Sequence, residues 1–156
     1  MTTFPDTIKV TIQDNDIRQP LPNIAIFIKL FATRKNDYYF MPEFSDENGN
    51  IIITKEWLNK EINKKVSLFI MDYASSLDTC YPKFEVWILS EGEVQRAIKA
   101  MNLYKSALGT KQEDIDRLAK VDNHKFEPVS KLIELHGEKV INVELKTKEI
   151  NKSLSN

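Results

Sequence analysis

The alternation of apolar and polar residues predicts the first β-strand. Ile8, Val10 and Ile12 alternate with polar residues between positions 7 and 13. Because successive side chains of a strand point to opposite faces, this period of two is typical of a half-buried strand. The next apolar run, residues 24–31, is apolar on both faces and therefore needs cover on both sides. We expect one face of this second strand to meet the core and the other to meet an additional element.

Turn signals and β-branched runs extend this β pattern. The polar run 45–50 contains an Asn-Gly pair, which is a strong turn signal. Thr54 is placed to cap a short helix, in which Trp57, Leu58 and Ile62 recur at helical spacing. The other strands of this part of the chain are predicted at residues 38–40, 51–54, 66–73 and 84–89.

The hydrophobic period changes to three or four residues after position 90. Capping boxes begin at Ser90 and at Thr110, and Gly109 is a natural helix stop between them. The pattern predicts a helical hairpin over residues 91–121, inserted between strands. Its first helix carries one apolar stripe, which suits the outer face of the sheet: Val94, Ile98, Met101, Tyr104 and Leu108.

The chain then returns to β-structure. Residues 130–135 and 140–145 predict a strand, a turn and a second strand. A helix over 128–136 that ends at Gly137 is an alternative interpretation. We favour the hairpin because the strand at 140–145 needs a partner strand.

The 156 residues have the size of a single domain. We expect residues 1–146 to form one mainly β domain, an antiparallel β-sandwich with a short helix and a helical insertion at 91–121. The polar tail 147–156 is expected to fray.

The order of these parts resembles the transthyretin-like or carboxypeptidase regulatory-like β-sandwich, a group that includes the B-type repeats of collagen adhesins. The resemblance rests on strand 8–12, the run 20–28, the turn and strand at 44–53, and the closing segment 126–145, about two-thirds of the chain. It implies the fold only, because this architecture hosts many unrelated functions. Hydroxyisourate hydrolases share the fold, but their signature needs a histidine on an early strand, where this chain carries Lys9.

The resemblance also raises the isopeptide bond between a lysine and an asparagine that adhesin repeats often carry. Lys9 and Asn142 lie on suitable strands, the first and the last. However, each lies between apolar neighbours, so their side chains are predicted to point away from the core. Such a bond forms in the core, where desolvation lowers the lysine pKa. We therefore expect two solvated strand residues.

Charge and composition argue against several classes of partner. The chain has 22 basic and 23 acidic residues, a formal net charge of −1, so nothing marks it as a nucleic-acid-binding protein. It contains neither the apolar start of a signal peptide nor a run long enough to span a membrane, so no membrane association is expected. Cys80 is the single cysteine, which fits a reducing compartment. We expect a cytoplasmic location.

No pattern of residues predicts a metal, a cofactor or a catalytic centre. His124 and His136 are the only histidines and lie too far apart for a short metal-binding motif. The oxygen-rich runs 14–16 and 46–50 could recruit calcium, but turn chemistry explains both. Cys80 with a histidine could make a nucleophile and a base, yet no third group is evident. The expectation is therefore no metal, no cofactor and no catalytic residue.

These exclusions leave binding as the predicted function: an adaptor module that recognises another protein through the helical insertion or through aromatic loops. The alternatives are a small hydrolase with an unidentified site and a carbohydrate-binding module that uses its tyrosines. Exposed cations on the insertion and the aromatic residues beside the two large turns are the predicted contact residues: Arg96, Lys99, Arg117, Tyr38, Tyr39 and Tyr81.

Overall fold

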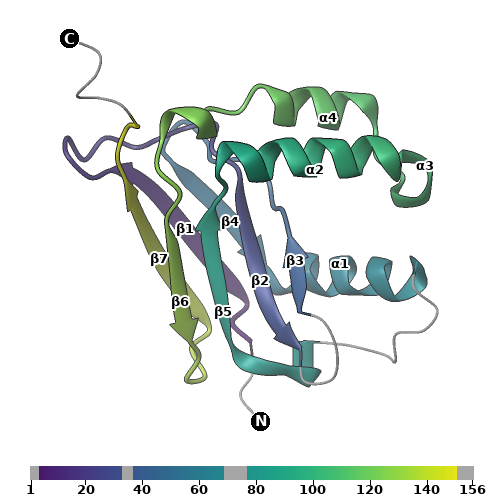
Figure 1. The fold of residues 1–156 in the computed structure, drawn as a ribbon. Helices are drawn as coiled ribbons and strands as arrows, with labels where there is room; N and C mark the ends of the chain where they lie inside the picture. The colour runs from purple at the N-terminus through teal and green to yellow at the C-terminus, as the bar shows by residue number, and fades with distance from the viewer. Residues whose placement is uncertain (1–3, 33–36, 69–76, 151–156) are drawn as a thin grey trace.

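The computed structural model describes residues 4–32, 37–68 and 77–150, which fold into two facing β-sheets and a group of helices (Figure 1). The strands and helices follow one another along the chain in this order: β1 Thr7–Asp14, β2 Ile26–Ala32, β3 Tyr38–Phe40, β4 Asn50–Thr54, α1 Lys55–Leu68, β5 Cys80–Ile88, α2 Glu91–Leu103, α3 Lys105–Leu108, α4 Gln112–Ala119, β6 Ser130–Glu134 and β7 Val140–Thr147. Short 3-10 turns precede β5 and follow α4, at Leu77–Thr79 and Asn123–Lys125.

The first sheet has the strand order β4-β1-β7. The predicted alternation of β1 is confirmed, because Ile8, Val10 and Ile12 are buried and their neighbours are not, apart from Asp14 at the end of the strand. β1 pairs antiparallel with β4 and parallel with β7. The parallel pair departs from the expected all-antiparallel arrangement.

The second sheet has the order β3-β2-β5-β6, and all its strand pairs are antiparallel. Its inner residues, such as Ile28 and Val86, share one apolar cluster with Val10 and Val143 of the first sheet. The two sheets therefore enclose a common core, and the described part of the chain is mainly β.

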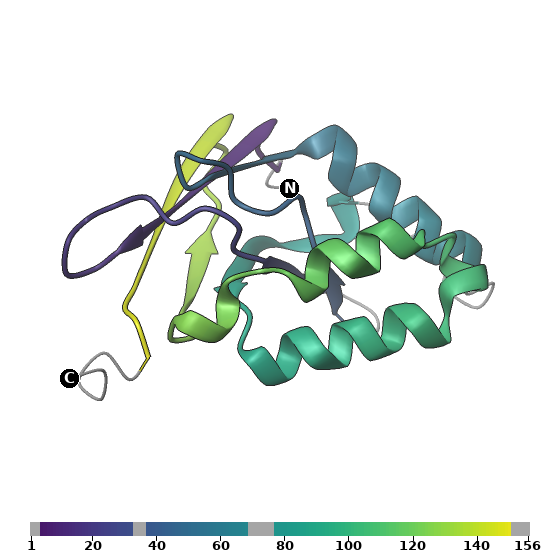
Figure 2. The same cartoon turned by 90° about the horizontal axis from the view of Figure 1, so that it is seen from above.

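The outer face of β2 has the second cover that its two-sided apolar pattern predicted. Ala25 and Phe27 pack in a separate cluster with Leu118 and Val121, from α4 and the turn after it. Figure 2 shows α2 and α4 lying on this side of the sheet. The inward side of α2 adds Val94, Ala97, Ile98 and Met101 to the same cluster.

The apolar stripe of α2 is shorter than predicted. Tyr104 is exposed, because α2 ends at Leu103 and the chain turns there into α3. Ile98 and Met101 are half-buried rather than buried. The side chain of Leu108 lies outside the described residues.

Helix α1 corrects two predictions. It runs from Lys55 to Leu68, so the expected short helix has 14 residues and the strand predicted at 66–73 begins as helix. The remainder of that predicted strand lies outside the described residues. Leu58 and Ile62, one turn apart, are both fully buried. Their burial on one face stabilises the helix, although β-branched Val66 lies near its end.

The predicted strands near the C-terminus exist, but they do not form a hairpin. β6 pairs with β5 in the second sheet, and β7 pairs with β1 in the first. The connection 135–139 crosses from one sheet to the other, with Leu135 buried and its N–H donating to the Pro82 carbonyl oxygen. A partner strand for β7 was required, but it came from the other end of the chain.

Two further expectations concern the same region. The frayed tail was predicted to begin at residue 147, yet Thr147 is buried and Ile150 N–H donates to the Lys125 carbonyl oxygen at 2.8 Å. Residues beyond 150 lie outside the described range.

The outward orientation of Lys9 and Asn142 is confirmed: they are register partners on β1 and β7, half-buried and exposed respectively.

Candidate functional site

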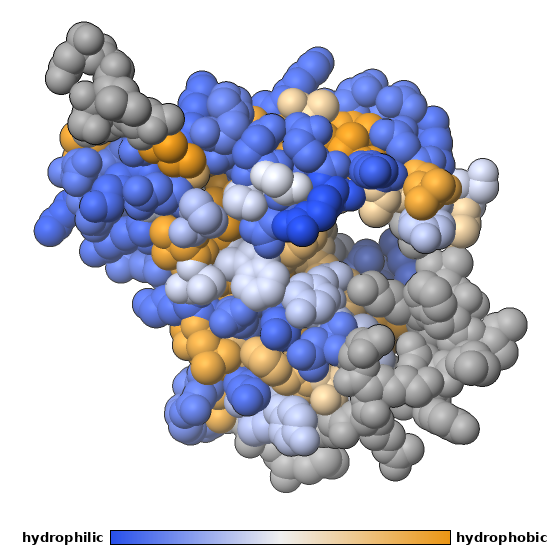
Figure 3. All heavy atoms as spheres, viewed as in Figure 1, coloured by the Kyte–Doolittle hydropathy of each residue, from blue (hydrophilic) through white to orange (hydrophobic). Residues whose placement is uncertain are grey.

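A cleft of about 1160 Å³ lies between α1 on one side and helices α2–α4 on the other (Figure 3). The segment 39–44, which contains the end of β3, forms the connection between the two walls. The side chains of the floor are mostly aromatic or sulfur-containing: Phe27, Tyr39, Phe40, Met41, Phe44, Trp57 and Met101. The site is therefore an apolar floor between two helical walls.

Strand register assembles the aromatic floor. Phe27 on β2 lies beside Trp87 on β5, with ring centres 6.4 Å apart, and Tyr39 on β3 is 5.7 Å from Trp87. Phe40 meets Trp57 of α1 edge to face at 6.2 Å. Tilted and edge-to-face pairs are favourable ring geometries, so the floor has a defined shape.

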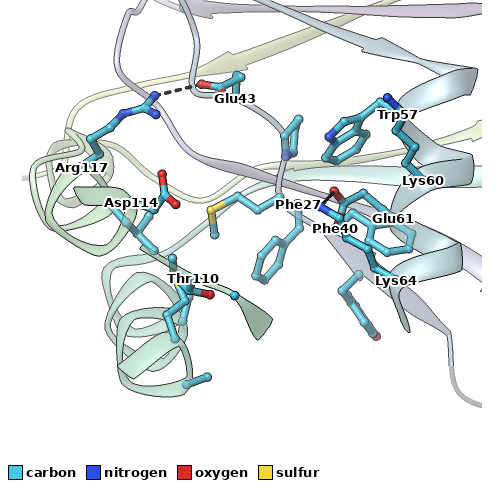
Figure 4. Close-up of a pocket in the computed structure, with 18 of the residues that line it drawn as sticks. Phe27, Phe40, Glu43, Trp57, Lys60, Glu61, Lys64, Thr110, Asp114 and Arg117 are labelled. Atoms are coloured by element: carbon cyan, nitrogen blue, oxygen red, sulfur yellow. Dashed lines mark hydrogen bonds and ion pairs between the residues drawn. The ribbon is translucent and has the colours of Figure 1, made fainter. Parts of the chain in front are cut away.

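Helix α1 supplies a wall with exposed cations. Thr54 caps the helix, since its Oγ1 accepts from Trp57 N–H at 3.1 Å. The burial of Leu58 and Ile62 turns Lys60 and Lys64 toward the rim, where Glu61 also lies (Figure 4). Lys60 forms an ion pair with Glu56 at 3.8 Å, and Lys64 forms one with Glu61 at 3.4 Å. Because both lysines are exposed, these pairs contribute little to stability.

The opposite wall is closed at one end by an ion pair. Arg117 of α4 donates to Glu43 Oε2 at 2.9 Å, and its guanidinium lies 5.4 Å from the centre of the Phe44 ring (Figure 4). Hydrogen bonding to Glu43 raises the pKa of Arg117, with further contributions from Asp114 and Glu113. Glu43 and Asp114 give this wall an acidic excess, whereas the α1 wall has a basic one.

Two of the predicted contact residues, Arg117 and Tyr39, lie at this cleft. Arg96 and Lys99 are exposed on α2 but do not line it. Tyr81 is 49% exposed on β5, also away from the cleft.

The prediction that Tyr38 is a surface contact was wrong. Its side chain is only 6% exposed, and its ring stacks on that of Phe40, with the ring centres 5.9 Å apart. In a three-residue strand with alternating faces, only Tyr39 points outward. Sequence reasoning also missed Trp57, Lys60 and Lys64. Their signal was the Lys- and Glu-rich pattern after Thr54, which continues the helix to the rim.

A second cluster of aromatic residues and lysines lies on the outer face of the second sheet, on β2, β3 and β5. Lys29 Nζ is 4.7 Å from the centre of the Phe31 ring and 5.6 Å from that of Tyr39. Lys83 Nζ is likewise 4.7 Å from Phe31 and 5.8 Å from Tyr81. These rings are partly exposed platforms with cations beside them.

The Cys80 thiol lacks the lowered pKa of an activated nucleophile. Cys80 is half-buried, and burial together with the nearby charge of Asp37 raises the pKa of its thiol to about 11. At neutral pH this thiol is protonated, whereas nucleophilic cysteines have lowered pKa values. Within residues 4–32, 37–68 and 77–150, no three His, Cys, Asp or Glu side chains gather in a way that could hold a metal ion.

Comparisons with known proteins give neither a family nor a relative. No family model matches the chain, and no curated protein matches it. Among solved structures, a pilus 2b backbone protein of group B streptococcus is similar over 99% of this chain and 45% of its own, at 9% identity and a TM-score of 0.47. The TIE protein of Bacillus anthracis covers 92% of this chain and 17% of its own, at 10% identity and a TM-score of 0.44.

A 9R-lipoxygenase from Cyanothece has a TM-score of 0.37 at 11% identity, over 96% of this chain and 18% of its own. The chain thus spans less than half the length of each of these structures. Among the described helices, none has the length and apolar character needed to cross a membrane.

Proposed function

We propose that this chain is a non-catalytic binding module that recognises another protein through the cleft between α1 and α2–α4. The observation that carries the proposal is the combination of an aromatic and methionine floor with charged walls of opposite sign. A volume of about 1160 Å³ exceeds that of most small-molecule pockets and suits a polypeptide segment. Methionines such as Met41 and Met101 are adaptable contacts for apolar side chains.

The charges of the walls indicate the chemistry of the partner segment. Lys60 and Lys64 would face acidic residues of the partner, and Asp114 would face a basic one. The apolar floor would take aromatic or aliphatic anchors between these charges. The segment is therefore amphipathic, with one apolar face and charges of opposite sign along its two edges.

Peptide display tests this proposal. A random peptide library is selected on the purified chain, and each recovered peptide is then measured against two variants. Lys60→Glu with Lys64→Glu reverses the lysine charges of the cleft wall, whereas Arg96→Glu with Lys99→Glu reverses two exposed charges outside the cleft. We expect the first pair to weaken binding about tenfold or more, through lost attraction and new repulsion, and the second pair to leave it unchanged.

Two results would overturn the proposal: recovery of no binding peptide, or peptides that bind both double variants equally well. Because all four side chains are exposed, neither double variant should change the folding of the chain. Circular dichroism spectra of both variants confirm that point before binding is compared.

A carbohydrate-binding function is the second candidate. It is favoured by the partly exposed Tyr39 and Tyr81, at 41% and 49%, beside Lys29 and Lys83. Sugar rings stack on such faces, and the lysines could bind their oxygens. Titration with an array of oligosaccharides, read by tryptophan fluorescence, tests it through Trp87 beneath Tyr39. Tyr39→Ala should abolish any signal.

We also propose that the two sheets form a transthyretin-like sandwich and that the chain works in a reducing, cytoplasmic environment. Supporting the first part are the facing sheets and the tight turn before β4. Supporting the second is a single cysteine, which cannot form an internal disulfide. An experimental structure and localisation of a tagged chain test the two parts separately.

A further inference from the structure

The hydrogen bonds at both ends of β7 fix which of its backbone groups face β1. Thr7 N–H donates to the Lys139 carbonyl oxygen, and Asn15 N–H donates to the Thr147 carbonyl oxygen. In a parallel pair, alternate residues of each strand bond to the neighbour. The N–H and C=O groups of residues 141, 143, 145 and 147 therefore point to β1, and those of the intervening residues point away from it.

The outward groups form a free edge of the first sheet, on the flank of the molecule (Figure 1). They belong to Val140, Asn142, Glu144 and Lys146, whose side chains are exposed. Within the described part of the chain these four residues have no backbone partner on that side. Four N–H donors and four C=O acceptors are thus presented in a row.

The chain itself already pairs with this edge just past its end. Glu127 N–H donates to the Lys148 carbonyl oxygen at 3.0 Å, and Ile150 N–H donates to the Lys125 carbonyl oxygen at 2.8 Å. Phe126 and Glu149 form an antiparallel bridge between these bonds. The edge is therefore geometrically able to take an antiparallel neighbour, and only residues 140–146 are left uncovered.

The two edge strands of the second sheet, β3 and β6, carry features that oppose further pairing. β3 has only three residues. β6 places Lys131 in register with buried Val86, so a charge lies on its core-facing side. Short edges and inward charges are common protections against added strands. β7 has neither, since its inward residues Ile141, Val143 and Leu145 are apolar.

We propose that the edge of β7 binds an extended segment of a partner protein as an additional antiparallel strand. The outer face of β7 sets the chemistry of that segment. A basic residue lies opposite Glu144 and an acidic residue opposite Lys146, because opposed charges on one face attract. The alternate residues of the segment are apolar, and they extend the inner face formed by Ile141, Val143 and Leu145. This surface is separate from the cleft, so either site can fail without the other.

The probe is a synthetic peptide, acetyl-Glu-Val-Lys-Ile-Thr-Val-Thr-amide. In antiparallel register its Glu lies opposite Lys146, its Lys opposite Glu144 and its last Thr opposite Val140. Hydrogen exchange of the labelled chain is followed by NMR. At a peptide concentration about ten times Kd, exchange of the Asn142, Glu144 and Lys146 amides should slow about tenfold. A peptide with Glu and Lys exchanged should bind about two- to fivefold more weakly.

Two matched variants separate backbone pairing from charge. Glu144→Pro removes one outward N–H but leaves the bonds to β1 intact, and edge strands tolerate such a proline. It should abolish peptide binding. Glu144→Thr keeps the N–H and loses one of the two charges, so it should still bind both peptides, with a smaller preference for the original one that Lys146 alone sets. The double variant Glu144→Lys with Lys146→Glu should prefer the exchanged peptide.

Three results would overturn the proposal. The first is unchanged amide exchange at saturating peptide. The second is equal binding by the Glu144→Pro variant, or, if that variant does not fold, a double charge variant that keeps the original preference. The third is slow exchange at Asn142 and Lys146 that depends on protein concentration without peptide, which would show two copies of the chain pairing instead.

Discussion

Asn123 and Ala25 are joined by two hydrogen bonds of 2.8 Å, one in each direction. Ala25 N–H donates to Asn123 Oδ1, and Asn123 Nδ2 donates to the Ala25 carbonyl oxygen. The same Nδ2 donates to the Leu89 carbonyl oxygen at 2.9 Å. One fully buried side chain thus pairs with the backbone where β2 begins and where β5 ends. It connects the turn after α4 to the sheet beneath.

Replacement of Asn123 by alanine should therefore destabilise the chain by about 3 kcal/mol or more, because three buried backbone groups each lose a hydrogen bond and only the Ala25 carbonyl oxygen keeps another, from Leu89 N–H. Urea unfolding followed by circular dichroism measures the change. Asn142→Ala is the matched control: this asparagine is exposed on β7, and its loss should cost less than about 0.5 kcal/mol. Equal stability of the two variants would contradict the role assigned to Asn123.

Gly49 is required by space as well as by backbone conformation. Its φ is +74°, and a Cβ there would lie 2.5 Å from the Ile12 carbonyl oxygen. Gly49 also accepts from Ile12 N–H through its own carbonyl, which holds the turn against β1. Gly109 has a similar φ of +64°, but a Cβ at that position would meet no atom within 4 Å.

Gly109→Ala should thus cost about 1–2 kcal/mol from backbone strain alone, and Gly49→Ala clearly more. Thermal unfolding of both variants measures the difference. If the two melting temperatures fall equally, the close approach to Ile12 is not a determinant of stability.

Leu118 should anchor α4 to the sheet. It is 1% exposed and packs with Ala25, Leu89 and Val121, so Leu118→Ala should cost about 2–5 kcal/mol. Leu103 is 71% exposed at the end of α2, and Leu103→Ala should change stability by less than about 0.5 kcal/mol. Chemical unfolding of the pair tests whether the helices are held by this cluster, since both variants remove the same atoms.

The pKa of Cys80 predicts a dependence of stability on alkaline pH. The folded-state pKa of about 11 is above the ordinary thiol value of 9.0, so the folded state holds the proton more tightly than the unfolded chain. The stabilisation is complete below pH 9 and is lost as the pH rises toward 11. Alkylation by iodoacetamide at about pH 8 should be much slower for the folded chain than for the chain in urea. Equal rates would show that the thiol is not shielded.

The sequence by itself determined most of the strands and, for β1 and β7, which side is buried. The alternation at 7–13 indicated the buried face of β1, because burial follows the pleat residue by residue, and the two-sided apolar run at 24–31 indicated that both faces of β2 are covered. The capping box at Ser90 placed the start of α2. The position of Lys9 and Asn142 between apolar neighbours also predicted that their side chains point outward. These are local properties, set by neighbours in the chain.

Only the tertiary structure decided how these segments pair and what they build. β7 met β1 rather than β6, because strand partners are chosen by contacts between residues far apart in the sequence. The cleft depends on the length of α1 and on the distance at which α4 lies from it, and no local pattern records either. Arg117 and Glu43, which close it, are 74 residues apart. Tyr38 and Tyr39 look alike in the sequence, but successive residues of β3 point to opposite faces, so Tyr38 is buried and Tyr39 is exposed.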